Sequence, residues 1–566
     1  MVSETTIMGH PRGLVILFLT EMWERFSYYG MRGLLVIYLT QHFLFSDEKS
    51  TVLYGAYTSL VYVMTIIGGA LADRYLGARK AVTFGAILLV IGHFGMSFEG
   101  NGSKQILTFD GVQYEIVLDA RGGDARQQIV SDNGMSYINF NASDMLIENP
   151  ESVGLPESIS RDSYTMSVVT EEVYLNILYL SLAFIIAGVG FLKANISTIV
   201  GSLYGFGDKR RDSGFTIFYM GINLGAFLAS IFCGYLGIVH GWKYGFGLAG
   251  IGMFIGLAIF LSFQHWLDGK AEPPSIERLK TKIFWFINIE WACYLVGLVI
   301  IAVSMLLVMN EELVGGILGP LGIIMFLTLL YYSFAQLQGD ERSRMLAAMY
   351  FILAQIPFWA LFEQAGSSLN LFTARLVDRE IFGWSVPGPV FQSLNAGYIF
   401  IFAPMVAWLW VWLSKRNLNP STPVKFAVGV AMAGLGFLSL VVGMKGSGVI
   451  GMTPVIFIFL IYWIHTMGEL MVSPVGLSAV TKLAPARIVG MTMGAWFLYS
   501  GLSNLLAGLI ASTTGAETIG GQMTDVAAAK AGYIEVYTQV GYIALGISVL
   551  MLIMAPVITK MMRGAD

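Results

Sequence analysis

The chain has 566 residues, of which 56% are hydrophobic and 12% are charged, and its formal net charge is −4. A soluble domain carries about 25% charged residues, so the composition excludes an ordinary soluble protein. The small negative net charge excludes a general nucleic-acid footprint. Cys233 and Cys293 both fall in apolar runs and imply no disulfide framework. The chain is therefore predicted to be an all-α polytopic membrane protein.

Apolar runs of about 20 residues recur from end to end, and each is long enough to cross a hydrocarbon core of about 30 Å. The first run leads directly into a charged motif without a cleavage-site pattern, so we expect it to be a retained span. Fourteen transmembrane helices are predicted, over residues 14–40, 52–72, 80–98, 173–202, 214–237, 242–265, 282–309, 313–336, 346–374, 389–414, 424–444, 450–482, 489–512 and 534–558.

The positions of Lys and Arg predict the orientation of these spans. The basic links 73–80, 207–211, 414–417 and 482–487 all fall on one side of the membrane. Because basic links favour the cytoplasm and the number of spans is even, both termini are expected to be cytoplasmic.

The long connection 99–172 is expected on the opposite side. Its segment "ILTFDGVQYEIVL" (106–118) alternates polar and apolar residues around Asp110-Gly111, which is a strong hairpin signal. We predict a small β-containing extracytoplasmic insert. A decorative loop is the favoured interpretation of its role, and a receptor module is the alternative.

A faint internal duplication predicts the domain organisation. Segments 190–204 and 468–483 occupy the fourth place in each half, and each precedes a basic link and a Gly-rich helix. The predicted parts are an N-terminal six-helix bundle (1–265), a linker with an inserted helical hairpin (266–340) and a C-terminal six-helix bundle (341–566).

The first span carries a charged stripe. Glu21, Glu24, Arg25, Tyr28 and Arg32 fall within an arc of about 100° on one helical face. Each charge costs roughly 2.5–3.5 kcal/mol at mid-membrane, so this face must meet the bundle interior or a wet cavity. A carboxylate that loses its Arg partner tends to take up a proton, which can link proton binding to substrate binding. A buried ion network that only holds helices together is the alternative.

Isolated charges recur in other apolar helices, at Lys193, Glu363 and Glu469. With the stripe on the first span they give nearly balanced acids and bases, which favours a shared central cavity with exchangeable partners. Polar and aromatic residues at compatible positions are Tyr62, Tyr219, Asn223, Gln392, Asn395, Ser473 and Trp496. For each aromatic residue alone, ordinary packing is the alternative.

These motifs resemble those of the proton-coupled oligopeptide transporters, the POT family of the major facilitator superfamily. "EMWERFSYYG" (21–30) is similar to the family's ExxERFxYYG motif, and "GGALADRYLGARK" (68–80) to the superfamily's loop motif after helix 2. Further matching blocks are "FYMGINLGA" (218–226), "FWALFEQAGSSL" (358–369), "FQSLN" (391–395) and "GELMVSPVGLSAVTKLAP" (468–485). Bacterial members insert a helical pair between the two bundles, as expected here.

The resemblance implies a symporter that imports di- and tripeptides with protons by alternating access. The implied proton-coupling residues are Glu21, Glu24, Arg25 and Glu469. The implied substrate-binding residues are Arg25, Tyr28, Tyr29, Tyr62, Lys193, Tyr219, Asn223, Trp359, Asn395, Glu469, Ser473 and Trp496. The implied gates are Arg32 with Glu363 on the outer side and Lys193 with Glu469 on the inner side.

The resemblance also implies a functional monomer in the bacterial inner membrane, with protons as the coupling ion and no other cofactor. A family relative that carries nitrate, glycosides or drug-like molecules is the alternative. An enzyme is not expected, because the chain has no H-E-x-x-H or G-x-S-x-G motif. Two departures are an alanine after Asn395, where the family often has proline, and the lack of the helix-2 histidine of animal members.

His465 lies one turn before Glu469. If both side chains faced the cavity, protonated His465 would make the release of a substrate amine from Glu469 sensitive to pH. A packed histidine with a backbone partner is the favoured alternative.

Overall fold

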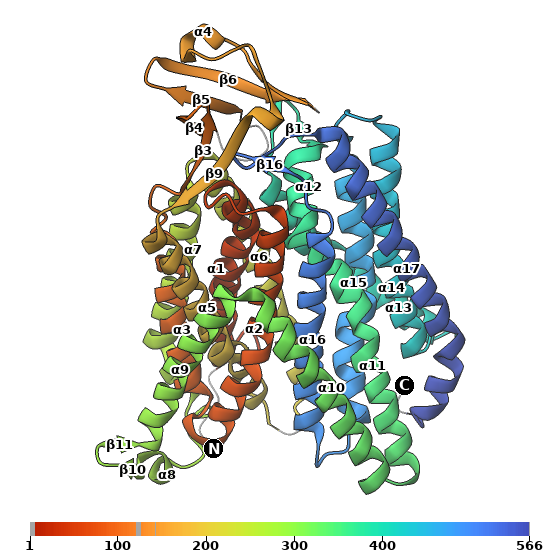
Figure 1. Cartoon of the computed structure of the whole chain (residues 1–566). Helices are drawn as coiled ribbons and strands as arrows, with labels where there is room; N and C mark the ends of the chain where they lie inside the picture. Colours follow the sequence, from red (N-terminus) through yellow and green to blue (C-terminus); the bar gives the residue numbers. More distant parts are fainter. Residues whose placement is uncertain (1–5, 120–125, 142, 206, 565–566) are drawn as a thin grey trace.

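A computed structural model describes residues 6–119, 126–141, 143–205 and 207–564, and it shows a long helical body with a strand-rich cap at one end (Figure 1). In these ranges, 13 helices are long and apolar enough to cross a membrane. Helix α1 (Gly13–Gln41), which carries the charged stripe, is not among these 13 but is 29 residues long, enough to cross a membrane as well. The predicted helical membrane fold is confirmed. We call the capped end the insert side and the opposite end, where both termini lie, the termini side.

The helices follow the predicted order along the chain. The long helices before residue 340 are α1, α2 (Asp47–Leu71), α3 (Ala78–Gly95), α5 (Glu172–Ser202), α6 (Arg211–Val239), α7 (Trp242–Phe263), α9 (Ile289–Met309) and α10 (Glu311–Gln336). The later ones are α11 (Gly339–Phe362), α13 (Ser393–Ser414), α14 (Thr422–Gly446), α15 (Ile456–Leu483), α16 (Val489–Ser512) and α17 (Val526–Met561). The short helix α12 (Ser368–Leu376) lies between α11 and α13.

Two of the predicted helix starts, at 282 and 450, are too early. Helix α9 begins later because the Asn288 side chain accepts a hydrogen bond from Trp291 N (2.9 Å) and so caps it. The residues before it pair as strands β10 (Lys282–Phe284) and β11 (Ile287–Asn288). Before α15, strand β15 (Thr453–Pro454) pairs with β12 (Val377–Asp378) instead of starting a helix.

Two further predicted spans differ from the structure. Helix α17 begins eight residues before the predicted start at 534, where the Asp525 side chain accepts a hydrogen bond from Ala528 N (2.9 Å). The predicted helix 346–374 is divided into α11 and α12 by a 3₁₀ turn at Glu363–Gly366. A charged residue of the candidate site therefore lies at a break in a span rather than within a regular helix.

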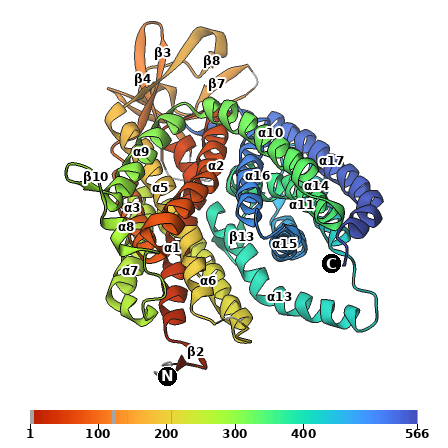
Figure 2. The same cartoon turned by 90° about the horizontal axis from the view of Figure 1, so that it is seen from below.

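The long helices gather into two groups that face each other, as the view from the termini side shows (Figure 2). Helices α1, α2, α3, α5, α6 and α7 form one group, which we call the N-terminal half, and α11 to α17 form the C-terminal half. Helix α9 packs on the N-terminal half, where Gly297 lies against Phe84 and Phe191. Helix α10 packs on the C-terminal half, where Tyr499 Oη donates to Gly322 O (2.9 Å). The residue boundaries of the three predicted parts stay a prediction.

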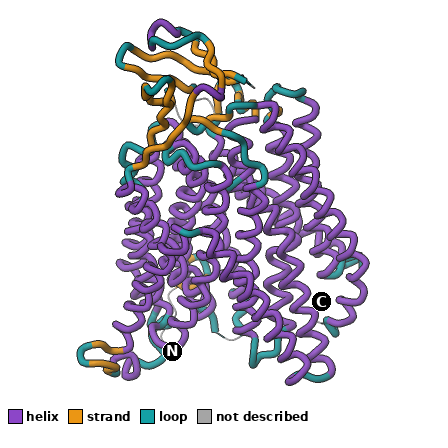
Figure 3. The backbone as a smooth tube through the Cα atoms, in the orientation of Figure 1, coloured by secondary structure: helices purple, strands orange, loops and turns teal. Residues whose placement is uncertain are grey.

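The connection 99–172 folds into a β-sheet on the insert side, which confirms the predicted β structure of the insert (Figure 3). Its extracytoplasmic location stays a prediction. Asp110 and Gly111 have φ of +49° and +77°, the left-handed conformation that a two-residue hairpin turn requires. The described strands have the spatial order β8-β7-β6-β5-β4-β3-β9. Their bounds are β3 (Ser103–Phe109), β4 (Val112–Leu118), β5 (Gln127–Ser131), β6 (Gly134–Phe140), β7 (Asp144–Ile147), β8 (Ser158–Ser160) and β9 (Tyr164–Thr170).

On the termini side, the loop before α3 is bound to the linker that follows α7. Gly77 has φ of +73°, and a Cβ atom there would lie 2.5 Å from Pro273 N, so only glycine allows this approach. Arg79 donates to both carboxylate oxygens of Glu272 (2.6 and 2.9 Å). These hydrogen bonds hold the pKa of Glu272 below its ordinary value. The linker is thus anchored to the N-terminal half.

Helices α2 and α5 make close backbone contact at Gly68 and Gly190. A Cβ atom on Gly68 would lie 2.1 Å from Gly190 O, and no flexible side chain can yield there. We expect Gly68→Ala to destabilise the protein by about 1–3 kcal/mol, measured as a lower midpoint of thermal unfolding in detergent. The matched control is Gly316→Ala in α10, where a Cβ atom meets nothing within 4 Å. Equal midpoints for the two variants would contradict the prediction.

Candidate functional site

The charged stripe of α1 forms a compact buried cluster in the N-terminal half. Arg25 Nε lies 2.7 Å from Glu21 Oε1 and 2.9 Å from Glu24 Oε2. Glu24 is fully buried, and neither of its oxygens accepts a hydrogen bond from the described residues. One guanidinium therefore serves two carboxylates, and this trio carries a net charge of −1 when both acids are ionised. Protonation of one acid removes the uncompensated buried charge, which is the chemistry that proton coupling needs.

A second cation lies on α5. Lys193 Nζ is 4.0 Å from the centroid of the Tyr62 ring on α2, which is a cation–π contact. Lys193 is half-buried, and no described carboxylate lies within ion-pair distance of it. Its ammonium group is therefore available to an anionic partner that enters the site.

The C-terminal half presents a carboxylate. Asn395 Nδ2 on α13 donates to Glu469 Oε2 (2.8 Å) and to Thr466 Oγ1 (3.0 Å), both on α15. Among the described residues, Glu469 forms no ion pair with Lys193, the partner that the sequence analysis gave it. The Lys193 ammonium group and the Glu469 carboxylate thus lie on opposite halves and are not paired in this conformation.

The other expected binding residues lie on helices around these groups. On α6, Asn223 is buried and donates to Tyr219 O (3.0 Å), whereas the Tyr219 side chain is exposed. On α11, Trp359 is half-buried and packs edge to face with Phe358 and Phe362. These contacts are also those of ordinary packing, so the predicted binding roles of these residues stay predictions.

The remaining expected residues show a similar range of burial. Tyr28 and Trp496 are buried, with 3% and 6% of their surface exposed. Tyr29 packs edge to face on Tyr28, with ring centroids 5.5 Å apart, and remains half-buried. Ser473 is half-buried on α15. Their predicted contacts with substrate also stay predictions.

Nearer the insert side, polar contacts join the two halves. Arg32 of α1 forms an ion pair with Glu363 at the break after α11, and both side chains are buried. Arg32 Nε also donates to the Tyr54 hydroxyl of α2. Tyr54 was not predicted as a site residue, although it lies two i+4 steps from Tyr62 on the same side of α2, a spacing that could have indicated it. Arg32 and Glu363 therefore meet as an ion pair, and their gating role stays a prediction.

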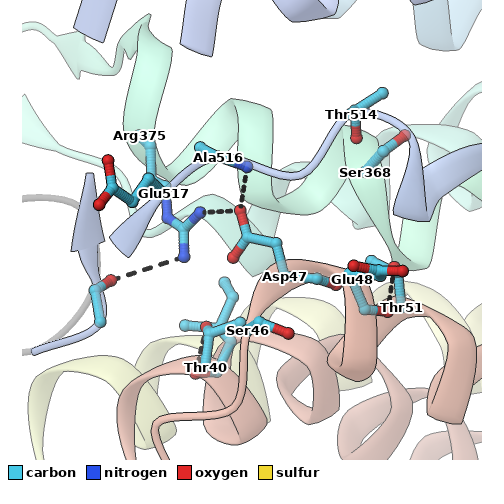
Figure 4. A network of polar contacts seen from close by, with 12 residues as sticks. Thr40, Ser46, Asp47, Glu48, Thr51, Ser368, Arg375, Thr514, Ala516 and Glu517 are labelled. Carbon is cyan, nitrogen blue, oxygen red and sulfur yellow. Dashed lines mark hydrogen bonds and ion pairs between the residues drawn. The ribbon is translucent and has the colours of Figure 1, made fainter. Parts of the chain in front are cut away.

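A second buried ion pair lies closer to the insert (Figure 4). Asp47 Oδ2 at the start of α2 accepts hydrogen bonds from Arg375 Nη1 at the end of α12 (2.7 Å) and from Ala516 N (3.1 Å). Both charged side chains are 2% exposed. The sequence did not indicate this pair, because an acid in the first turn of a helix normally stabilises that helix alone. Like the Arg32–Glu363 pair, it joins the two halves near the insert.

His465 packs against α14. Its ring is buried, Nε2 lies 3.0 Å from Ala433 O on α14, and the ring packs against Phe437. This is the packed arrangement with a backbone partner that the sequence analysis favoured. We expect His465→Gln to lower the thermal unfolding midpoint while the dependence of transport on pH overlays that of the parent. A profile displaced along the pH axis would show instead that the histidine acts on Glu469.

Comparison with known proteins agrees with the motifs and the fold. The family model described as "POT family" matches residues 79–526. The peptide transporter YePEPT of Yersinia enterocolitica is 31% identical over 531 residues, which cover 89% of this chain and 88% of that protein. Dipeptide and tripeptide permease A of Escherichia coli (strain K12) is 28% identical, over 97% of this chain and 93% of the permease.

A solved structure extends the agreement to three dimensions. The crystal structure of peptide transporter POT in complex with sulfate has a TM-score of 0.75 and 31% identity, and the match covers 99% of this chain and 98% of that one. The resemblance found in the sequence motifs and the major facilitator fold that it implied are therefore confirmed. The protein is a transporter and not an enzyme. The chain belongs to the POT family of peptide transporters.

Proposed function

We propose that this chain is a proton-coupled symporter that imports di- and tripeptides by alternating access. It acts as a monomer in the bacterial inner membrane with both termini in the cytoplasm, and protons are its coupling ion. The observation that carries the proposal is the buried Glu21–Arg25–Glu24 trio, in which two carboxylates share one guanidinium. Such a trio exchanges a proton when its cation is drawn to another anion.

The polarity of the site supports a zwitterionic peptide as the substrate. Arg25 and Lys193 in the N-terminal half supply positive charge for a peptide carboxylate, and Glu469 with Asn395 in the C-terminal half supplies acceptors for a peptide amine. A peptide bound at both poles draws Arg25 away from its acids and joins the two halves. Proton uptake and closure of the halves around the substrate are thereby linked.

The test is uptake of labelled dialanine into liposomes that hold the purified protein, with an inward proton gradient and then without one. We expect uptake against the peptide gradient only while the proton gradient is present, and its loss when the proton gradient is collapsed. Absence of peptide uptake by folded protein would contradict the proposal. It would favour the alternative of a family relative that carries nitrate, glycosides or drug-like molecules.

A further inference from the structure

The β-insert of the N-terminal half is bound to a hairpin of the C-terminal half. This hairpin consists of β16 (Thr518–Ile519) and β17 (Gln522–Met523), between α16 and α17, and β16 lies under the sheet in Figure 1. Gln127 Nε2 on β5 donates to Ile519 O, and Gly520 N donates to Gln105 Oε1 on β3. Both glutamines are buried. The turn of the hairpin thus satisfies its backbone groups with side chains of the insert.

The same turn completes the apolar core of the insert. Ile519 is 7% exposed and packs in one cluster with Leu107, Ile116 and Ile129 of the sheet. Gly520 has φ of +56°, and a Cβ atom there would lie 3.2 Å from Ile116 Cγ2. The hairpin turn of the C-terminal half and the insert of the N-terminal half therefore pack closely into one apolar core.

The loop that carries the hairpin also contacts the helices of the N-terminal half. Ala516 N donates to Asp47 Oδ2 (3.1 Å), as Figure 4 shows. A Cβ atom on Gly521 would lie 2.9 Å from Thr40 O at the end of α1. Arg161 Nη1 forms an exposed ion pair with Glu517 Oε2 (3.0 Å). The loop 513–525 is thus held from the insert above and from α1 and α2 below.

We propose that the insert is a latch that holds the insert side closed. The inference rests on the proposed alternating access, in which the two halves must separate on this side for substrate to enter. Because the insert belongs to the N-terminal half and its bound hairpin to the C-terminal half, separation must withdraw Ile519 from the sheet and break the contacts of Gln105 and Gln127. The latch therefore sets how often the insert side opens.

A cysteine placed at the buried position Ser50 can report opening of the insert side. Ser50 is fully buried on α2, between Asp47 and Tyr54 on the face that meets the C-terminal half. In a background in which Cys233 and Cys293 are replaced by alanine, Ser50→Cys is the only thiol in the chain. A membrane-impermeant maleimide added from the insert side labels this thiol only when the side opens, whatever the substrate is.

The reporter is combined with weakened latches in the full-length protein in liposomes. We expect Gln105→Ala and Gln127→Ala each to raise the labelling rate about tenfold, which corresponds to a shift of about 1.4 kcal/mol in the opening equilibrium. The matched control is Gln128→Ala, since Gln128 is the next residue on β5 and points to the opposite face of the sheet. Rates equal to that of the control in both latch variants would overturn the proposal.

A cross-link provides the opposite perturbation. In the alanine background without the reporter, cysteines at Ile116 and Gly520 are placed to form a disulfide between sheet and hairpin. We expect oxidation to abolish dialanine uptake, and a reductant to restore it. In the same background, a control disulfide at the paired positions Thr108 and Gln113, within the insert, should leave uptake unchanged. Full uptake by the oxidised 116–520 form would overturn the latch.

The two readouts separate failure of the latch from failure of the proposed function. If the parent and the reduced double-cysteine variant do not take up dialanine, the peptide proposal is wrong, and the maleimide rates still decide the latch. If both transport dialanine and the oxidised form does so equally well, the latch is wrong and the function stands. Faster labelling in both glutamine variants together with reversible block by the disulfide supports both.

Discussion

Glu24→Gln is expected to abolish proton-driven accumulation of peptide while peptide counterflow continues. Glu24 is fully buried beside Arg25, and the side-chain amide of glutamine is not titratable at neutral pH, so it cannot bind and release the coupled proton. A gradient of about one pH unit stores about 1.4 kcal/mol, enough for roughly tenfold accumulation for each coupled proton. In the variant the accumulation ratio should fall to about one. Counterflow needs no net proton movement, so it should retain a larger share of the parent rate.

The measurement is the steady-state ratio of labelled dialanine inside and outside proteoliposomes, paired with a counterflow assay on the same preparation. Glu21→Gln should behave similarly, because Glu21 shares the same guanidinium. The control is Glu172→Gln, the same chemical change at an exposed position in the first turn of α5. If accumulation and counterflow survive equally in the Glu24 variant, the assignment of proton coupling to this trio is wrong.

Asp47→Asn is expected to be strongly destabilising, although Asp47 lies at a helix start close to a loop. It leaves the buried Arg375 guanidinium without its carboxylate, and removal of one partner from a buried ion pair costs about 3–5 kcal/mol. Arg375→Gln should have a similar cost, since it leaves the Asp47 carboxylate unpaired. The double variant should lose less than the sum of the two single losses, because no uncompensated charge then remains.

Thermal unfolding of the parent, the two single variants and the double variant gives this coupling as a double-mutant cycle. The matched control is Glu115→Gln, which removes the carboxylate of the exposed pair Lys104–Glu115 (3.1 Å). An exposed pair contributes about 0–1 kcal/mol, so its loss should change the unfolding midpoint little. Strictly additive losses in the cycle would contradict a direct interaction between Asp47 and Arg375.

Much of the fold is predictable from local sequence. A run of about 20 apolar residues has one stable conformation in a membrane, because every backbone group must find its partner within the helix. The Asp110-Gly111 turn is also local, since its left-handed conformation suits these two residues. The starts of α9 and α17 were missed because they depend on single capping residues, Asn288 and Asp525, beside apolar segments that gave no signal of their own.

The candidate site was predicted in part for the same reason. Helical period and the cost of charge in a membrane place Glu21, Glu24 and Arg25 on one interior face, and these three residues do lie together. The period does not specify partners on other helices. Lys193 and Glu469 were expected to approach each other, but in this conformation Lys193 lies on Tyr62 and Glu469 binds Asn395. Their assigned roles stay predictions.

Hydropathy, turn chemistry and desolvation act over a few residues, so the membrane fold, the presence of the insert and the interior face of α1 could be predicted from the sequence. The pairing of Asp47 with Arg375, the contact of His465 with α14 and the binding of the 518–523 hairpin to the insert could not be predicted in this way. These contacts join residues far apart in the chain. They depend on how whole helices pack against each other, and local periodicity carries no information about that packing.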